Sequence, residues 1–230
     1  MDKLILAFSS LPGLLSRGLP ERNALIGQLC RQLPVGLEEC SFNLALEDPA
    51  YPGGAAPIFK VIITLRWLQA LDDPSIPLRA ALDWSAPLVD DQTKLQVWAV
   101  KSFVPWCGER PPLPGEQVPG FKLIVFSYRL AHIDRKTFED KYRNEHTPKV
   151  AVHCPGIGTY QQNFVQRQLH GDILEVDGVA EMNFRTAEDF TERFHANAES
   201  GAFIRAGAAT FMDNSRAQYF SCTETLWCFP

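Results

Sequence analysis

Several features that identify common protein classes are missing from this 230-residue sequence. No apolar run approaches the roughly 20 residues that a membrane-spanning helix needs. No run of lysine or arginine exceeds two residues, and the formal net charge is −5. Because binding to phosphate groups needs clustered cations, this charge pattern argues against a nucleic-acid partner. The start of the chain carries Asp2 and no small-x-small cleavage site, so we expect a cytoplasmic protein that binds no membrane.

The sequence also lacks the signatures of common cofactors. It contains neither a G-x-x-x-x-G-K-S/T nor a G-x-G-x-x-G motif, so no nucleotide cofactor is expected. The six cysteines form no C-x-x-C pair and match no zinc-binding spacing, which favours reduced, buried thiols. No H-x-x-x-H or H-E-x-x-H pair is present, and we therefore predict no metal site.

A proline-rich stretch lies near the middle of the chain. Val104 to Gly120, VPWCGERPPLPGEQVPG, contains five prolines and three glycines. Because proline fixes φ and has no amide donor, this stretch is expected to be neither helix nor central strand. We predict a linker over residues 105–120, with one domain at 1–104 and another at 121–230.

The two predicted domains begin alike, with short apolar strands at Lys3 to Phe8 and Lys122 to Phe126, each starting with lysine. Helical patterns follow at 21–33 and 135–150. Further strands are predicted at 41–46, 58–68, 95–104, 159–165, 178–184 and 218–228, with helices near 78–82 and at 186–195. Both halves then have the β-α-β-β-α-β order of a ferredoxin-like unit. We expect an α+β fold in which two such repeats pack sheet to sheet as an intrachain dimeric α+β barrel.

The second half carries a series of motifs with a recognisable spacing. Phe138 to Pro148 has the form F-x-x-x-Y-x-N-x-H-x-P, Pro155 to Tyr160 is P-G-x-x-x-Y, and Asp177 to Glu181 is D-G-V-A-E. With these motifs, residues from about 121 to 229 resemble the EthD family, within the dimeric α+β barrel superfamily. The first half lacks the His-x-Pro signature, so it looks like a degenerate copy that kept the fold and lost the site.

The resemblance implies the fold more closely than the reaction. Members and relatives are linked to isomerisation, cyclisation, dehydration and decarboxylation of small organic compounds without a cofactor. Other relatives bind haem or oxidise substrates without metals. Lys141 stands where the family pattern usually has an aromatic residue, and Tyr142 stands at its tryptophan position, so the resemblance does not carry over a substrate.

His146 is the principal candidate for catalysis. No histidine occurs in the first 131 residues, and imidazole exchanges protons near neutral pH. The predicted position of His146 at the C-terminal end of a helix favours its protonated form through the helix dipole. The alternative is a structural histidine that ties the helix end to a carbonyl. The other four histidines are more typical of exposed or capping positions, although their convergence on a metal or haem stays open.

Further candidates lie on strands and turns around His146. A hydroxyl of Tyr128 or Tyr160 can donate to a developing oxyanion, and Asn144 can orient His146 or bind a substrate oxygen. Core packing is the alternative for the tyrosines, and turn or cap bonding for asparagine. The predicted substrate contacts are Tyr142, Phe126, Gln162, Asn163 and Asp213.

These features predict a cofactor-independent lyase or isomerase that uses general acid–base catalysis. The expected substrate is a small aromatic or polyketide-like oxygenated compound. No cofactor is expected, with haem as the alternative. Two other functions stay open on the same fold: a haem-binding or cofactor-free oxidoreductase or monooxygenase, and a non-catalytic accessory protein that binds a small molecule. A homodimer of the whole chain also stays open.

Overall fold

The computed structural model describes residues 2–33, 36–46, 58–69, 73–90, 93–108, 114–172 and 174–229. The strands are β1 (Lys3–Phe8), β2 (Leu37–Ala45), β3 (Val61–Trp67), β4 (Leu95–Trp106), β5 (Glu116–Gln117), β6 (Phe121–Ser127), β7 (Thr159–His170), β8 (Gly178–Phe184) and β9 (Gln218–Cys228). The helices are α1 (Pro12–Leu15), α2 (Leu19–Gln32), α3 (Ser75–Ser85), α4 (Arg135–Asp140), α5 (Thr147–His153), α6 (Ala187–Thr191) and α7 (Ala198–Ala208), with the helical turns η1 (Ala86–Leu88) and η2 (Lys141–His146).

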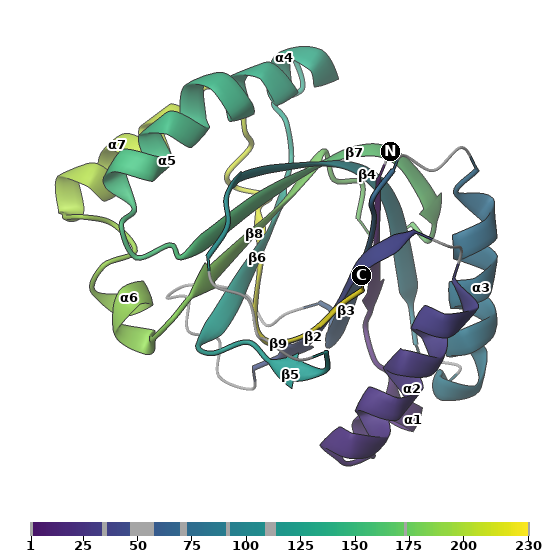
Figure 1. Ribbon diagram of the computed structural model, residues 1–230. Helices are drawn as coiled ribbons and strands as arrows, with labels where there is room; N and C mark the ends of the chain where they lie inside the picture. Colours follow the sequence, from purple (N-terminus) through teal and green to yellow (C-terminus); the bar gives the residue numbers. More distant parts are fainter. Residues whose placement is uncertain are drawn as a thin grey trace.

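The strands of both halves form one antiparallel barrel (Figure 1). The order around it is β2-β3-β1-β4-β7-β8-β6-β9, and pairing of β2 with β9 closes the ring. The two-residue strand β5 adds to β9. The two halves therefore share a single sheet, and they meet at the β4–β7 and β2–β9 pairs.

This arrangement shows that the predicted fold class is wrong. Two ferredoxin-like repeats packed sheet to sheet would keep separate sheets, each with its own edges. Instead, β4 of the first half pairs with β7 of the second, with Val100 opposite Val165 and Ser102 opposite Asn163. An edge strand leaves backbone N–H and C=O groups unpaired, and closing the barrel satisfies them. The chain is a closed eight-stranded antiparallel β-barrel with helices outside it.

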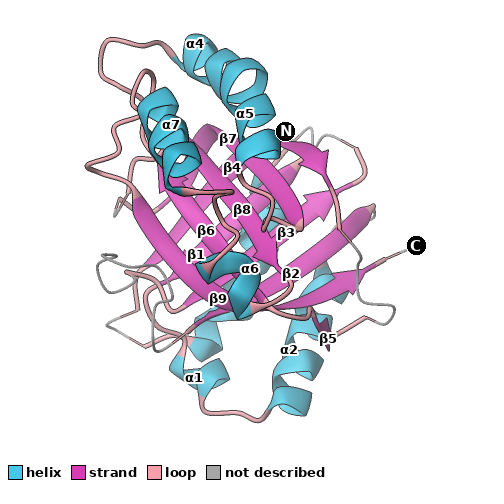
Figure 2. Cartoon of the chain, turned by 90° about the vertical axis from the view of Figure 1, so that its left-hand side faces the viewer, coloured by secondary structure: helices cyan, strands magenta, loops and turns pink. Residues whose placement is uncertain are grey.

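Helices cover the outside of the barrel in two groups, one from each half. Figure 2 shows α1 and α2 below the barrel and α4, α5 and α7 above it. Successive strand side chains point to opposite faces, so each strand serves both the helical layer and the interior. In β1, for example, Leu4 and Leu6 pack under the helices, whereas Ile5 and Ala7 face inward.

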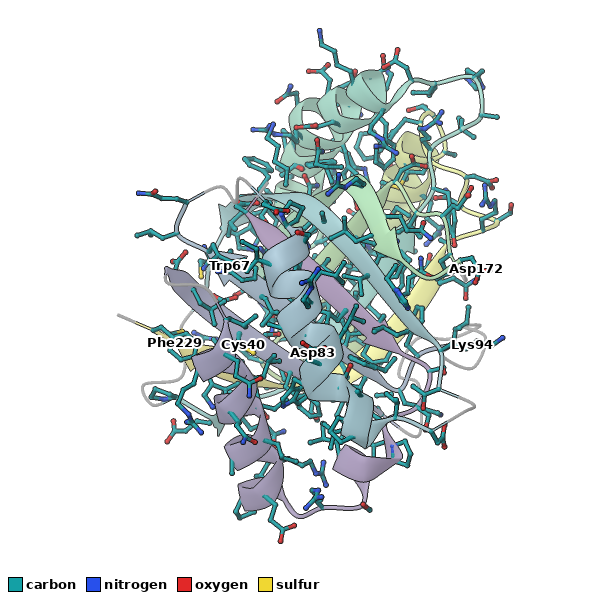
Figure 3. All side chains as sticks on the ribbon, turned by 90° about the vertical axis from the view of Figure 1, so that its right-hand side faces the viewer. Cys40, Trp67, Asp83, Lys94, Asp172 and Phe229 are labelled. Carbon is teal, nitrogen blue, oxygen red and sulfur yellow. The ribbon has the colours of Figure 1, made fainter. Side chains whose placement is uncertain are left out.

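The two ends of the barrel differ. Figure 3 shows Trp67 at one end of the strands and Lys94 at the other. Toward the Lys94 end, the interior is filled by Phe59, Trp98 and Phe126, whose ring centroids lie 5.6–6.2 Å apart. These three rings fill the interior at this end of the barrel, whereas polar side chains and a cavity lie toward the other end.

The helix predicted over 135–150 is present, but it continues as α4, η2 and α5 to His153. Pro148 has no N–H to donate within the helix. The chain accommodates it with a π-helical turn, in which the N–H of Thr147 donates to the carbonyl of Tyr142 five residues earlier. The prediction that the helix ends at His146 is therefore wrong, because His146 lies inside a continuous helical segment.

Other elements differ from the sequence prediction in extent. Helix α7 was not among the predicted elements, and the helix predicted over 186–195 forms only as α6. Strand β4 continues through Pro105 into the predicted linker. Pro105 lies within a register shift between Phe103 and Trp106, where no backbone N–H is required for pairing with β7. Residues 109–113 of that linker lie outside the described residues. None of the described helices has the length and apolar character needed to cross a bilayer.

Candidate functional site

The barrel wall separates the predicted site residues into two groups. The outer group lies between the helices and the sheet, and we call it the His146 cluster: His146, Tyr142, Tyr160 and Gln162. The inner group faces the barrel interior: Phe126, Tyr128 and Asn163. The two remaining predicted residues, Asn144 and Asp213, join neither group.

His146 is buried, with 7% of its surface exposed. Its ring centroid lies 5.4 Å from that of Tyr142 and 5.6 Å from that of Phe211. Burial, and secondarily the charge of Lys149, lowers the pKa of His146 to about 4. The imidazole is therefore neutral at pH 7, which is the opposite of the protonated form expected for a helix C-terminus.

Hydrogen bonds fix the polar groups around His146. The amide of Gln162 donates to Thr147 Oγ1 at 2.8 Å and to the hydroxyl oxygen of Tyr160 at 3.0 Å. The hydroxyl of Thr147 donates to the carbonyl of Tyr142 at 2.9 Å and so braces the π-helical turn. Burial raises the pKa of both Tyr142 and Tyr160, which keeps both phenols protonated and able to donate.

Two buried polar atoms of the His146 cluster have no hydrogen-bond partner, His146 Nδ1 and Gln162 Oε1. Buried polar atoms are normally paired, because leaving one unpaired costs about 1–3 kcal/mol. A neutral imidazole, two phenols and an amide thus lie together among aromatic rings with unused hydrogen-bonding capacity. Groups of these kinds are chemically able to donate and accept protons.

The inner group contacts a different set of residues. The guanidinium carbon of Arg216 lies 4.1 Å from the ring centroid of Tyr128, and burial raises the pKa of that phenol. The amide of Asn163 donates to Glu181 Oε1 at 2.8 Å. Because the sheet lies between these side chains and His146, they cannot act with it on one small substrate.

The side chains of Asn144 and Asp213 form hydrogen bonds only with residues close to them in sequence. The exposed amide of Asn144 donates to Asp140 Oδ1 at 2.7 Å, one helical turn away. Asp213 accepts from the hydroxyl of Ser215 at 2.6 Å and from its backbone N–H at 3.2 Å. The geometry gives no support to their predicted catalytic and substrate-binding roles.

The remaining histidines do not converge. His153 Nδ1 lies 3.0 Å from a serine hydroxyl of α7, and His195 Nδ1 lies 3.4 Å from Cys154 Sγ. His132 and His170 are exposed on other parts of the surface. Within the described residues, no group of three or more His, Cys, Asp or Glu side chains is arranged to hold a metal ion.

A chain of four charged side chains crosses the barrel interior: Lys3, Glu181, Lys122 and Glu224. Lys3 Nζ donates to Glu181 Oε1. Lys122 Nζ lies 2.6 Å from Glu181 Oε2 and 2.5 Å from Glu224 Oε1. The amide of Asn183 donates to Glu224 Oε2 at 2.7 Å. Each carboxylate oxygen of the two glutamates therefore accepts from at least one donor.

The charges in this chain hold one another ionised. Burial favours the neutral amine of Lys122, but attraction to Glu181 and Glu224 outweighs burial and raises its pKa. Burial likewise favours the protonated form of Glu181, but Lys122 and Lys3 outweigh it and hold its pKa well below the ordinary range. Lys122 is thus a fixed ammonium ion and does not act as a nucleophilic amine.

A cavity of about 490 Å³ opens above this chain, at the end of the barrel where β3 terminates. We call it the mouth cavity. Its volume falls in the range of small-molecule sites. The charged part of its lining includes Lys122, Glu181 and Glu224, and Val118 and Leu226 are among its apolar residues.

Sequence reasoning missed the mouth cavity. The one feature of the sequence that could have indicated the cavity is the lysine at the start of each of two similar strands, Lys3 and Lys122. Period-two alternation places Lys3 on the same face as Ile5, among interior residues. Glu181 and Glu224 lie on β8 and β9, which flank the strand of Lys122, whereas the contact between Lys3 of β1 and Glu181 crosses the closed barrel.

The described residues do not fit a haem. A haem needs an axial side chain that faces a cavity of porphyrin size. The lining of the mouth cavity contains no histidine or tyrosine, and its Cys107 is exposed at the surface. His146 faces the rings of Tyr142 and Phe211.

A family comparison finds a match within the second half of the chain. Residues 131–215 match the family described as the EthD domain. The match covers α4 through α7 and confirms the resemblance drawn from the motifs between Phe138 and Glu181. No curated protein matches the sequence.

Similar solved structures extend over the whole chain. A protein described as anthrone oxidase-like has a TM-score of 0.57 and 8% identity, covering 98% of this chain and 91% of its own. A monooxygenase candidate from Lactobacillus acidophilus NCFM has a TM-score of 0.51 and 8% identity, covering 99% and 97%. A mutant chlorite dismutase from Candidatus Nitrospira defluvii, in complex with cyanide, has a TM-score of 0.47 and 12% identity, covering 97% and 89%. At 8% identity, the first two similarities show a shared fold and nothing about function. The third structure, with a TM-score below 0.5, is too distant to support a conclusion.

Proposed function

We propose that the chain is an enzyme whose reaction takes place at the His146 cluster, which lies within the residues that match the EthD domain. The reaction is a cofactor-independent lyase or isomerase step on a small aromatic or polyketide-like oxygenated compound. One observation carries the proposal: a buried, neutral His146 with an unpartnered Nδ1 lies beside two protonated phenols. Perturbed pKa values and unpaired buried polar atoms are both typical of functional sites.

The proposed chemistry begins with proton removal. In the tautomer with a free Nδ1, His146 takes a proton from a carbon next to a carbonyl, and the electron pair moves onto the carbonyl oxygen. The hydroxyl of Tyr160 or Tyr142 donates to the enolate oxygen that forms. Return of the proton to another carbon gives an isomer, whereas departure of a leaving group gives a lyase product. A positioned acid or base of this kind typically contributes about 10²- to 10⁴-fold in rate.

Aromatic rings favour a planar, apolar substrate. Phe211 packs against both His146 and Tyr142, with centroid distances of 5.6 Å and 5.5 Å. It follows α7 in a turn, outside the helices and strands. We infer that the substrate ring displaces the ring of Phe211 and occupies the same aromatic environment. Phe211→Trp should then weaken substrate binding more than it weakens folding.

The test compares three proteins: the native chain, His146→Ala and the exposed control His132→Ala. Each is incubated with a small-molecule extract of the source organism, and masses are followed over time. We expect a compound that is consumed by the native protein and by His132→Ala, and about 10²- to 10⁴-fold more slowly by His146→Ala. Consumption by His146→Ala at the native rate would refute the assignment.

The product distinguishes the alternatives. Loss of water or carbon dioxide indicates a lyase, and an unchanged mass with a new retention time indicates an isomerase. A product that has gained an oxygen atom indicates the oxidoreductase alternative. One structural neighbour is described as anthrone oxidase-like, which is the reason to test for it. Binding of a compound that is never converted indicates the accessory-protein alternative.

A further inference from the structure

The mouth cavity is lined by residues from both halves of the chain. Glu39 and Arg66 come from β2 and β3, whereas Glu116, Glu181 and Glu224 come from β5, β8 and β9. The His146 cluster lies on the other side of β7 and shares no residue with this lining. The cavity is therefore separate from the site proposed for the reaction.

Strand pairing turns the side chain of Glu116 toward this cavity. Glu116 lies directly opposite Leu226 in the β5–β9 pair, and directly opposite residues share one face of a sheet. Glu224 lies two residues before Leu226 and so shares that face, on which it joins the charged chain inside the barrel. Glu116 and Val118 are half-buried, whereas Gln117 between them is exposed. Glu116 thus faces the cavity, with Val118 beside it and Leu226 opposite it.

The cations in the lining already have partners. Lys122 Nζ contacts two carboxylates of the charged chain. Arg66 forms ion pairs with Glu38 and Glu39, at 2.8 Å and 2.9 Å. Arg185 is exposed, and it too has an interaction partner. An anionic ligand would therefore have to compete with existing partners for each of these three cations.

Glu116 differs from the other carboxylates of the lining. Glu39, Glu181 and Glu224 each contact a lysine or an arginine. Within the part of the chain that the structure describes, the carboxylate of Glu116 forms no hydrogen bond or ion pair. A carboxylate that is half-shielded from water and has no counter-ion attracts a ligand that carries a positive charge.

The groups around Glu116 select the kind of cation. A calcium ion takes about six to eight oxygen ligands. No group of three or more His, Cys, Asp or Glu side chains among the described residues is arranged to hold a metal ion. An ammonium group, in contrast, can form a charge-assisted hydrogen bond with a single carboxylate. Val118 and Leu226 offer apolar surface next to that carboxylate, and the cavity volume of about 490 Å³ suits a small organic molecule.

We propose that the mouth cavity binds a primary amine in its ammonium form, with a small apolar body. The ammonium group donates to the carboxylate of Glu116, and the body lies against Val118 and Leu226. This site goes beyond the reaction proposed at His146. Because the two sites share no residue, failure of either proposal leaves the other unaffected.

The test measures binding of 2-phenylethylamine to the full-length protein by isothermal titration calorimetry. An aliphatic amine of this kind is protonated at pH 7. Two probes of similar shape separate charge from shape: 2-phenylethanol is neutral, and 3-phenylpropanoate is an anion. We expect saturable binding of the amine, about tenfold tighter than that of the alcohol, which follows from the larger contribution of hydrogen bonds to charged groups. The anion should bind most weakly.

Two variants and two matched controls locate the site. Glu116→Gln keeps the shape but removes the charge, and it should weaken binding of the amine about tenfold while changing binding of the alcohol less than about twofold. Glu199→Gln, at an exposed position of α7, changes the net charge equally and should bind like the native protein. Val118→Trp fills the cavity beside Glu116 and should weaken binding of both compounds. Val152→Trp, on the exposed face of α5, should weaken neither.

The outcomes decide the proposal. Weaker binding of the amine in Glu116→Gln and Val118→Trp, with native binding in both controls, supports it. Absence of saturable binding of 2-phenylethylamine at millimolar concentrations overturns it. Native-like binding of the amine in Glu116→Gln or in Val118→Trp, or tighter binding of 3-phenylpropanoate than of the amine, also overturns it. Circular dichroism of each variant establishes that the comparison is between folded proteins.

Discussion

Gln161 and Gln162 are adjacent on β7, yet their amides lie on opposite sides of the barrel wall. Gln162 donates to Thr147 and Tyr160 in the His146 cluster, whereas Gln161 lies in the lining of the mouth cavity. Strand alternation makes this placement inevitable once the register is fixed. A single strand thus separates two chemically different environments, and changes to one residue of the pair report on one environment at a time.

The first prediction concerns the protonation of His146. Since burial lowers its pKa to about 4, the imidazole should stay neutral from pH 7 down to about pH 4.5. A titration of the ring nitrogens by ¹H–¹⁵N NMR measures this directly, with exposed His132 as the internal reference. An inflection for His146 near 6.5, the value of an unperturbed imidazole, would contradict it.

The same shift makes stability depend on pH. The unfolded chain binds a proton at His146 below about pH 6.5, whereas the folded chain binds it only near pH 4. Stability should therefore fall as the pH drops through this window, with a contribution from His146 of about 3 kcal/mol. Urea unfolding at pH 7 and at pH 4 measures the loss. His146→Phe, which keeps a ring in place, should lose less stability between the two pH values than the native protein does.

The second prediction concerns the charged chain in the barrel. Glu181→Gln removes the shared counter-ion of Lys3 and Lys122 and leaves two buried ammonium groups poorly compensated. Breaking a buried ion pair in this way costs about 3–5 kcal/mol. The matched control is Glu145→Gln, which breaks the exposed pair with Lys141 and should cost less than about 1 kcal/mol. Equal midpoints for the two variants in urea would show that the buried chain is not coupled to folding.

The features that the sequence predicts correctly are those fixed by residues close together in the chain. Local periodicity predicted β1 and β9 at their observed bounds. Helical spacing and strand alternation also account for the shared faces of Tyr142 with His146 and of Tyr160 with Gln162. The position of the helix end was not predictable in this way. Proline usually stops a helix, and only the π-helical turn lets this one pass Pro148.

The closed barrel and the mouth cavity required information that lies far apart in the chain. The seam between β2 and β9 joins residues such as Phe42 and Thr225, and no local pattern specifies that pairing. The closed barrel also brings Lys3 of the first half to Glu181 of the second. Tyr128 was assigned to the His146 site because its phenol could donate to an oxyanion, and Asn163 because it is a polar residue close to Tyr160 on the same strand. Alternation within their strands turns both side chains inward.

The third prediction compares two glycines with the same backbone conformation. Gly36 and Gly120 have φ of +90° and +80°, respectively, a region that residues with a Cβ rarely adopt. A Cβ on Gly120 would lie 1.9 Å from the carbonyl oxygen of Phe184, whereas one on Gly36 would meet nothing within 4 Å. Gly36→Ala should cost about 1 kcal/mol, the conformational term alone. Gly120→Ala should cost at least about 3 kcal/mol, because the start of β6 must also shift. Similar costs for the two variants would show that the close approach at Gly120 relaxes without penalty.

The fourth prediction concerns the side chain that braces the π-helical turn. Thr147 donates to the carbonyl of Tyr142 and accepts from Gln162, so it connects the turn to β7. Thr147→Val keeps the shape but removes both hydrogen bonds, and it should destabilise the fold by about 1–3 kcal/mol. Thr210→Val removes one exposed hydrogen bond to a carbonyl of α7 and should cost less than about 1 kcal/mol. Because Thr147 precedes Pro148, loss of the brace should also disorder the segment that holds His146. Hydrogen exchange of the amides from 141 to 147 measures that opening, and the fold would not depend on the brace if the rates matched those of the native protein.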